Sequence, residues 1–153
     1  MDFGSLAELI DLNRDKAVEF GSGNCDLNPT ATRVQETEDR VRAKLPPSYL
    51  WFVNNYGGGE IYGEEIFSIY RVFRPESAGD IAVNTCRFRE SGFISATEIA
   101  LCANDFGEIF TLDVSVSSDD GEYAVYVRRG QYRVAYAENF AEFLAKRIQN
   151  QES

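Results

Sequence analysis

The sequence contains no histidine, and this absence removes several classes of catalytic site. Histidine is the usual general base near neutral pH, a common zinc ligand and the base of most Ser and Cys nucleophile arrangements. Catalysis would have to rest on carboxylates, lysine, tyrosine or a metal held by oxygen atoms. We therefore expect a protein that is not an enzyme and that has no catalytic residues, metal or cofactor.

Cysteines are few, and long apolar runs are missing. Cys25, Cys86 and Cys102 are odd in number and widely spaced, so they predict free thiols and no disulfide framework or CxxC metal site. Cys102 is the one expected in the core. No run approaches the roughly 18 apolar residues of a membrane helix, and acids occupy the N-terminus where a signal peptide is basic. A cytoplasmic protein with no membrane contact is expected.

Basic residues are also in deficit. The 153 residues include 25 Asp and Glu against 15 Lys and Arg, giving a net charge of −10 that divides evenly as −5 in each half. Such a surface repels nucleic acid and attracts basic partners, although solubility alone would also explain it. The length and the 44 % hydrophobic content predict one domain spanning residues 1–153, monomeric or weakly dimeric.

The N-terminal third is rich in helix signals. Ser5 and Glu8 have capping-box spacing, which predicts a helix over 5–19, followed by a loop over 21–30. A charged helix from Thr32 should stop before Pro46, because a residue preceding proline disfavours helix.

The stretch LPPSYLWFVNNYGGGEIYG at 45–63 predicts a helix that starts at Pro47 and ends at three glycines. Aromatic and apolar residues recur in it at helical spacing, and a strand should follow at 60–62. Leu50 and Trp51 do not lie on this apolar face of the predicted helix. Either the N-terminal arm covers them, which we prefer, or they form an exposed anchor for a partner.

From residue 64 the pattern favours strands. A strand is predicted over 65–73, a short helix from Asp80, hairpins joining 98–103 to 108–113 and 122–129 to 132–136, and a closing helix capped by Asn139 and Glu142. Helices, about five or six mostly antiparallel strands in a central sheet, and a C-terminal helix describe an α+β fold.

Three clusters near the hairpins could be sites. In two acidic groups, the carboxylates could share a proton or hold a divalent cation. Neither group has the spacing of an EF-hand loop, and we prefer the interpretation that these residues serve ordinary turns. The tyrosines could pack in the core or form a protein-binding sheet face. The first acidic group comprises Asp105, Glu108 and Asp113, the second Asp119, Asp120 and Glu122, and the tyrosine group Tyr123, Tyr126, Tyr132 and Tyr136.

In order, the pattern LPxxYxxF, glycines, an Asp and a Gly (Asp105, Gly107) before a strand, and a Phe-rich last helix resembles the SUKH superfamily, which includes fungal Smi/Knr regulators and bacterial immunity proteins. The resemblance spans about 34–148. It departs from the family where Gly57 replaces an Asn and where Glu108 replaces an Asp. The residues that carry it are Leu45, Pro46, Tyr49, Phe52, Tyr56, Gly58, Gly59, Asp105, Gly107, Leu112, Asp113, Phe140, Phe143 and Leu144.

The resemblance implies a non-enzymatic protein that binds and neutralises a cognate polymorphic or contact-dependent toxin. A basic, nuclease-type toxin suits the acidic surface, because carboxylates can occlude the cationic groove that binds nucleic acid. The alternative is a regulatory scaffold of the Smi/Knr type; a carboxylate-dependent enzyme is a third interpretation. The candidate toxin contacts are Glu60, Glu64, Glu65, Asp105, Glu108, Asp119, Asp120, Glu122, Trp51 and Tyr123.

Overall fold

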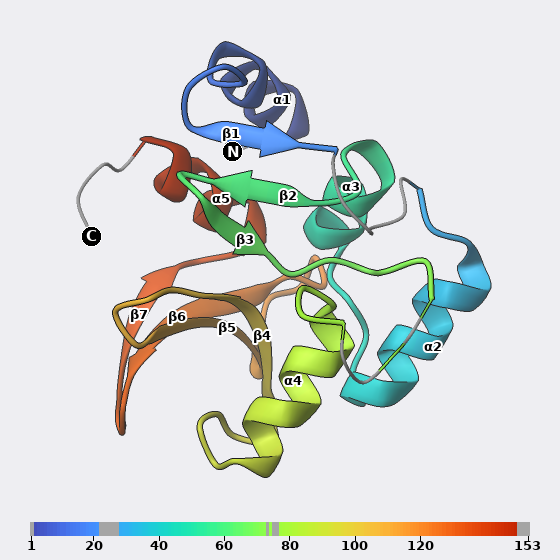
Figure 1. Cartoon of the computed structure of the whole chain (residues 1–153), viewed down its shortest axis with the longest axis vertical. Coiled ribbons are helices and arrows are strands. Elements are labelled where there is room, and N and C mark those ends of the chain that lie inside the picture. The colour runs from blue at the N-terminus through green and yellow to red at the C-terminus, as the bar shows by residue number, and fades with distance from the viewer. Residues whose placement is uncertain (1, 22–27, 73, 75–76, 150–153) are drawn as a thin grey trace.

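The computed structural model describes residues 2–21, 28–72, 74 and 77–149 and has an α+β architecture (Figure 1). The elements in chain order are α1 (Phe3–Leu12), β1 (Val18–Phe20), α2 (Ala31–Val41), α3 (Pro47–Asn55), β2 (Gly59–Ile61), β3 (Glu64–Ile66), α4 (Ile81–Glu90), β4 (Glu98–Ala103), β5 (Glu108–Ser117), β6 (Tyr123–Arg129), β7 (Tyr132–Ala137) and α5 (Phe140–Gln149).

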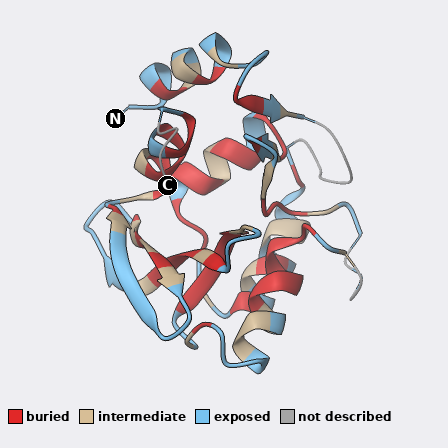
Figure 2. Ribbon diagram, turned by 60° about the vertical axis from the view of Figure 1, so that its left-hand side comes forward, coloured by how far each residue is buried: buried red, intermediate tan, exposed pale blue. Residues whose placement is uncertain are grey.

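The strands form two antiparallel sheets, one in the order β1-β2-β3 and the other in the order β4-β5-β6-β7. Helix α5 lies between the sheets and contacts α1, α3, β6 and β7, while α4 packs against β4 and α2 (Figure 1). Buried residues gather on the surfaces that these elements turn toward one another (Figure 2). The predicted α+β class and C-terminal helix are confirmed; the strands described number seven, in two sheets, where we expected about five or six in one.

The LPxxYxxF stretch forms the centre of the core. Helix α3 begins at Pro47 as predicted, and Tyr49 and Phe52 are fully buried. The Tyr49 hydroxyl donates to the Phe67 carbonyl at 2.8 Å, which satisfies its polar atom inside the protein. The Phe140 ring of α5 packs edge-on against Tyr49, with ring centroids 5.1 Å apart. These residues therefore join α3 to α5 at the centre of the core.

The N-terminal arm differs from the prediction. Helix α1 ends at Leu12, and its cap is Asp2, which accepts the Ser5 N–H at 2.8 Å. The helix predicted over 5–19 is therefore too long, and its proposed Ser5 cap is wrong. The chain then forms β1, a strand that the sequence reading missed because its partner β2 lies far along the chain. The Phe3 ring stacks on Trp51 at 5.0 Å, so the arm covers Trp51 as we preferred.

One helix and one strand end earlier than the sequence predicts. Helix α2 stops at Val41 because Arg42 adopts the left-handed conformation (φ 59°), several residues before Pro46. The strand predicted over 65–73 ends at Ile66, since the Phe67 N–H donates to Leu101 and Ser68 bridges to Asp80 in the parallel direction. Position 73 lies outside the described residues.

The remaining local predictions agree with the structure. Asp80 caps α4 by accepting the Val83 N–H at 3.0 Å, and both predicted hairpins form. Asn139 caps α5 by accepting the Glu142 N–H, while Glu142 reaches back to the N–H of Glu138.

Of the three cysteines, Cys86 and Cys102 are free thiols, and Cys25, in the predicted loop, lies outside the described residues. Burial raises the pKa of the Cys102 thiol to about 12, which keeps it protonated in the core.

Candidate functional site

Three glutamates stand side by side across the small sheet. In the antiparallel register, Glu19 of β1 faces Glu60 of β2, and Glu60 faces Glu65 of β3. Because side chains alternate along a strand, all three project from the face opposite Val18 and Ile61, which are buried. Directly opposed residues have Cβ atoms about 4.5–5.5 Å apart. We call Glu19, Glu60 and Glu65 the glutamate row.

The glutamate row has no compensating cation within the described part of the chain. Glu19 and Glu60 are exposed, and Glu65 is half-buried. Burial raises the pKa of Glu65; the Tyr70 hydroxyl, 3.3 Å from its carboxylate, opposes this shift, and the charge of Glu60 adds to it. Like charges directly opposite each other destabilise a sheet by about 0.2–1 kcal/mol per pair. The row is therefore a surface on which a cationic partner would relieve an existing repulsion.

Glu64 lies next to the row in sequence but on the other face of the sheet. Its carboxylate pairs with Arg147 of α5 at 2.6 Å, in a partly buried position. This pair attaches the C-terminal helix to the small sheet, so Glu64 has an internal partner, and its toxin contact stays a prediction.

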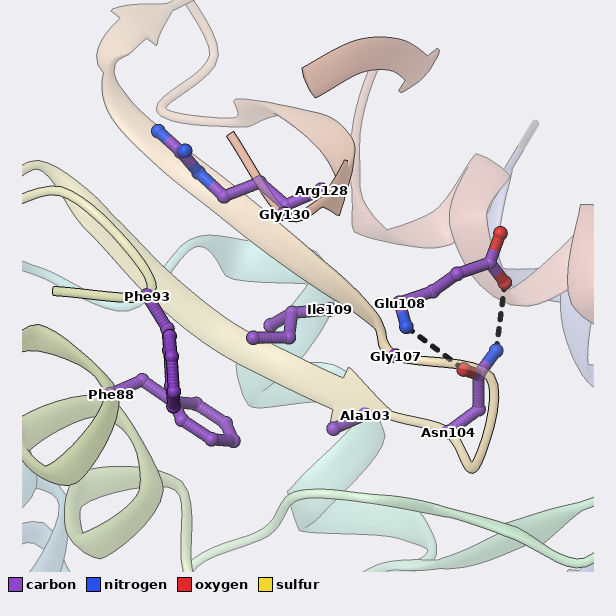
Figure 3. Close-up of a pocket in the computed structure, with 9 residues that line it drawn as sticks. All are labelled: Phe88, Phe93, Ala103, Asn104, Gly107, Glu108, Ile109, Arg128 and Gly130. Carbon is purple, nitrogen blue, oxygen red and sulfur yellow. Dashed lines mark hydrogen bonds between the residues drawn. The ribbon is translucent and has the colours of Figure 1, made fainter. Parts of the chain in front are cut away.

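The β4–β5 turn separates two of the predicted contacts. Asp105 is exposed at the tip, whereas Glu108 is only 6 % exposed. The Asn104 side chain donates to Glu108 at 2.8 Å and accepts the Glu108 N–H, as Figure 3 shows, and Arg129 pairs with the same carboxylate. Glu108 is therefore bonded within the protein, whereas Asp105 faces outward, and the toxin contacts at both residues stay predictions.

The β5–β6 turn also contains both exposed and buried acidic residues. Asp119 and Asp120 are exposed, but Glu122 is 7 % exposed and binds Ser48 through both carboxylate oxygens, at 2.8 Å to the N–H and 2.6 Å to the hydroxyl. Pro46 provides no side-chain cap for α3, so Glu122 satisfies the first turn of this helix from the β5–β6 turn, far away in sequence. Glu122 therefore caps α3, and the toxin contact predicted for it stays a prediction.

The ten predicted contacts do not form one patch. The two turns lie at opposite ends of β5, a strand of ten residues that spans roughly 30 Å. Trp51 is half-covered by Phe3, and the Tyr123 hydroxyl donates to the Lys44 carbonyl at 2.9 Å. Asp119 and Asp120 share one exposed turn, while the exposed Glu60 and the half-buried Glu65 lie opposite each other on one face of the small sheet, where Glu19 joins them.

A second surface feature is a cavity of about 350 Å³ on the outer face of the large sheet (Figure 3). Phe88 and Phe93 form one wall, with Ile109 on the strand opposite and Arg128 beside it. The exposed fraction of Phe93 is 58 %, and Arg128 pairs with the buried Glu98 at 2.7 Å. This pocket is apolar and locally neutral, in contrast to the glutamate row. Sequence patterns did not predict it, because residues from separate helices and strands line it.

Glu98 should make the fold sensitive to acid. Burial acts to raise the pKa of this carboxyl, but hydrogen bonds from Ser95 and Thr111 and the charge of Arg128 outweigh it and lower the pKa. A depressed pKa contributes stability above the unfolded-state value, and that stability is lost as pH falls through the folded-state pKa. The wild-type urea midpoint should therefore fall steeply below about pH 4.5.

Glu98→Gln provides the test. The variant should lose about 1–3 kcal/mol at neutral pH, because Arg128 loses its charged partner, and should show a flatter acid profile. Asp119→Asn, at an exposed turn, serves as the control and should keep the wild-type profile. Parallel profiles for wild type and Glu98→Gln would remove Glu98 as the source of the acid sensitivity.

Within the described ranges, no three Asp, Glu or Cys side chains form a group able to hold a metal ion. None of the described helices is long and apolar enough to span a bilayer.

Comparison with known families identifies the family to which the chain belongs. The SUKH_6 family model, described as SMI1-KNR4 cell-wall, matches residues 31–144, so the chain belongs to this family of the SUKH superfamily. No curated protein matches the chain. Membership is consistent with a Smi/Knr-type module or a toxin-immunity protein, and SUKH domains generally bind partner proteins. The match includes Glu60 and Glu65 of the glutamate row, whereas Glu19 lies before it.

Proposed function

We propose that the chain is an immunity protein that binds a basic, nuclease-type toxin and neutralises it by covering its substrate-binding surface. The glutamate row is the observation that carries this proposal. It places three carboxylates, which no cation of the described residues compensates, on adjacent strands of one face, where the strand spacing is about 4.8 Å.

The chemistry of such a partner follows from the row. Nucleases bind phosphates through Lys and Arg side chains, and carboxylates in a row can meet the same cations. The net charge of −10 adds long-range steering toward a basic protein. Neutralisation then needs only occlusion and no chemical step. The absence of histidine from the sequence supports a binding role over catalysis, and the proposed place of action is the cytoplasm.

The proposal predicts a trade-off at Glu60, which faces two like charges. Glu60→Gln should raise the free energy of unfolding by about 0.5–1 kcal/mol, because it removes both repulsions. The same change should weaken binding of the captured basic partner about tenfold, since a rigid ion-pairing position is lost. Urea unfolding measures the first effect and calorimetric titration the second.

The matched control is Glu90→Gln, which removes one negative charge at the exposed end of α4. Figure 1 places α4 on the other side of the molecule from β2, so this variant should bind the partner as wild type does. Equal affinity of wild type and Glu60→Gln would contradict a role for the row.

A regulatory scaffold of the Smi/Knr type is the second candidate, and the apolar pocket favours it. Phe93 at its wall and Phe106 at the neighbouring turn are 58 % and 82 % exposed, and exposed aromatic rings beside a pocket can anchor protein partners. If this function holds, Phe93→Ser should abolish capture of partners that Glu60→Gln still binds.

A further inference from the structure

On the basis of the second candidate function, a scaffold of the Smi/Knr type, we propose that the apolar pocket binds an extended segment of a partner protein in which an aromatic and an acidic residue lie two positions apart. The pocket, of about 350 Å³, lies between the Phe88 and Phe93 rings and the outer face of β5 and β6 (Figure 3). Residues of α4, of β4 to β6 and of the adjoining turns line it, so it is separate from the glutamate row.

The walls of the pocket favour an aromatic side chain. The Phe88 and Phe93 rings lie at an angle of 58°, with centroids 6.3 Å apart. Aromatic rings attract one another in such tilted arrangements, and the exposed Phe93 ring has a surface free for a third ring. The half-buried Ile109 lies across the pocket, and Arg128 borders it. A guanidinium also binds aromatic faces, so an aromatic ring makes contacts here that an aliphatic side chain does not.

Arg128 supplies hydrogen-bond donors for a carboxylate. Its Nε atom donates to both oxygens of Glu98, at 2.7 and 3.0 Å, and its two terminal nitrogens have no acceptor among the described residues. The side chain is 19 % exposed, so a ligand can reach it. A guanidinium presents forked N–H groups that match the two oxygens of a carboxylate. The free donors of Arg128 therefore select an anionic group beside the apolar cavity.

The acidic groups near this arginine are already engaged. Glu98 also accepts hydrogen bonds from the Ser95 N–H and the Thr111 hydroxyl, and Glu108 pairs with Arg129. A carboxylate has about four acceptor sites, which these donors fill at Glu98. An ammonium group of a ligand would find these acceptors occupied. A carboxylate would find free donors and paired charges, although the chain as a whole carries −10.

An extended protein segment can present both groups together. Residues i and i+2 of such a segment point to the same side, about 6.5–7 Å apart, so one ring can enter the pocket while the carboxylate reaches Arg128. Exposed aromatic surface also continues beyond the pocket. Phe106, 82 % exposed, lies between Asn104 and Gly107, which line the cavity. A small ligand in the pocket would leave this ring in solvent, whereas a partner protein can cover it.

Nuclear magnetic resonance titration of the isotope-labelled protein with short peptides tests this chemistry. The peptides, with blocked ends, are Glu-Ala-Phe-Ala-Glu, its analogue Gln-Ala-Phe-Ala-Gln, and Glu-Ala-Ala-Ala-Glu. The first should shift the amide signals of the residues that line the pocket. The second should bind about tenfold more weakly, because it lacks the carboxylates, and the third should not bind. The charge is varied on the peptide because replacing Arg128 would leave the buried Glu98 without its partner.

Phe93→Ser should weaken binding of the first peptide about tenfold or more. The matched control is Tyr132→Ser, which removes another exposed ring. Tyr132 lies opposite Arg129 in the hairpin and so on the other sheet face from Arg128, and this variant should bind as wild type does. Glu60→Gln should also bind the peptide normally, which separates the pocket from the toxin proposal. Far-ultraviolet circular dichroism confirms that each variant is folded.

Three results would overturn the inference. Equal affinity for the Glu and Gln peptides would remove the carboxylate from the recognition. Free phenylpropionate, which carries both a ring and a carboxylate, would assign the pocket to a small ligand if it bound as tightly as the first peptide. A partner protein that wild type captures and Phe93→Ser loses, without any binding of the first peptide, would leave the scaffold function standing and reject this ligand chemistry.

Discussion

Replacing Gly59 by alanine is expected to lower the free energy of unfolding by about 3 kcal/mol or more. Gly59 has φ +146° at the start of β2, where β1 crosses closely. An added Cβ would overlap the Glu19 carbonyl oxygen and lie 2.6 Å from Cα of Phe20. Both atoms belong to the backbone of β1, so relief requires that the β1–β2 register break. The glutamate row depends on this register and should be lost with it.

Gly92→Ala separates the steric effect from backbone conformation. Gly92 also has positive φ (+76°), but its added Cβ would meet no atom within 4 Å. This variant should lose only about 1 kcal/mol, the cost of placing alanine in that conformation. Urea unfolding followed by circular dichroism gives both values. Equal losses at the two positions would contradict close packing of β1 on Gly59.

Reversing the charge of the row, by lysine at Glu19, Glu60 and Glu65 together, should weaken binding of the basic partner about 1,000-fold. Placing like charges together across an interface costs several kcal/mol, and about 4 kcal/mol corresponds to that factor. The association rate should fall as well, because the steering field is reversed locally. Stopped-flow association at two salt concentrations measures the rate, and titration calorimetry measures the affinity.

The control carries the same total charge change at other sites. Lysine at Asp105, Asp119 and Asp120 reverses three exposed acids in two turns that lie roughly 30 Å apart. This protein should lose less than about tenfold in affinity, through the general field alone. A larger loss from the turn variant than from the row variant would move the binding surface to the turns, where the sequence had placed part of it.

Local signals predicted much of the fold. The helix at Pro47, the cap at Asp80 and the two hairpins each depend on residues close together in sequence, and all are present. Strand β1 was missed because a strand of three residues has little pattern of its own and is formed by pairing with β2. Glu19 could enter the site only once that register was known.

The internal partners of Glu64, Glu108 and Glu122 could not be predicted for a similar reason. The turn sequence SSDDGE suggests exposed carboxylates, yet Glu122 binds Ser48, which lies far away in sequence. No local pattern distinguishes a carboxylate that caps a distant helix from one in solvent. The SUKH motif did not resolve this, because its aromatic residues, such as Tyr49 and Phe140, form the core and so specify the fold more than the binding surface.

The most direct test of the central claim is a pull-down from the native cells with three baits: wild type, Glu90→Gln and the triple lysine variant of the row. We predict that wild type and Glu90→Gln retain one basic protein, that the row variant does not, and that equimolar wild type abolishes the nuclease activity of that protein. Retention of the same partner by all three baits, or a retained partner whose activity is unchanged by equimolar wild type, would contradict the account.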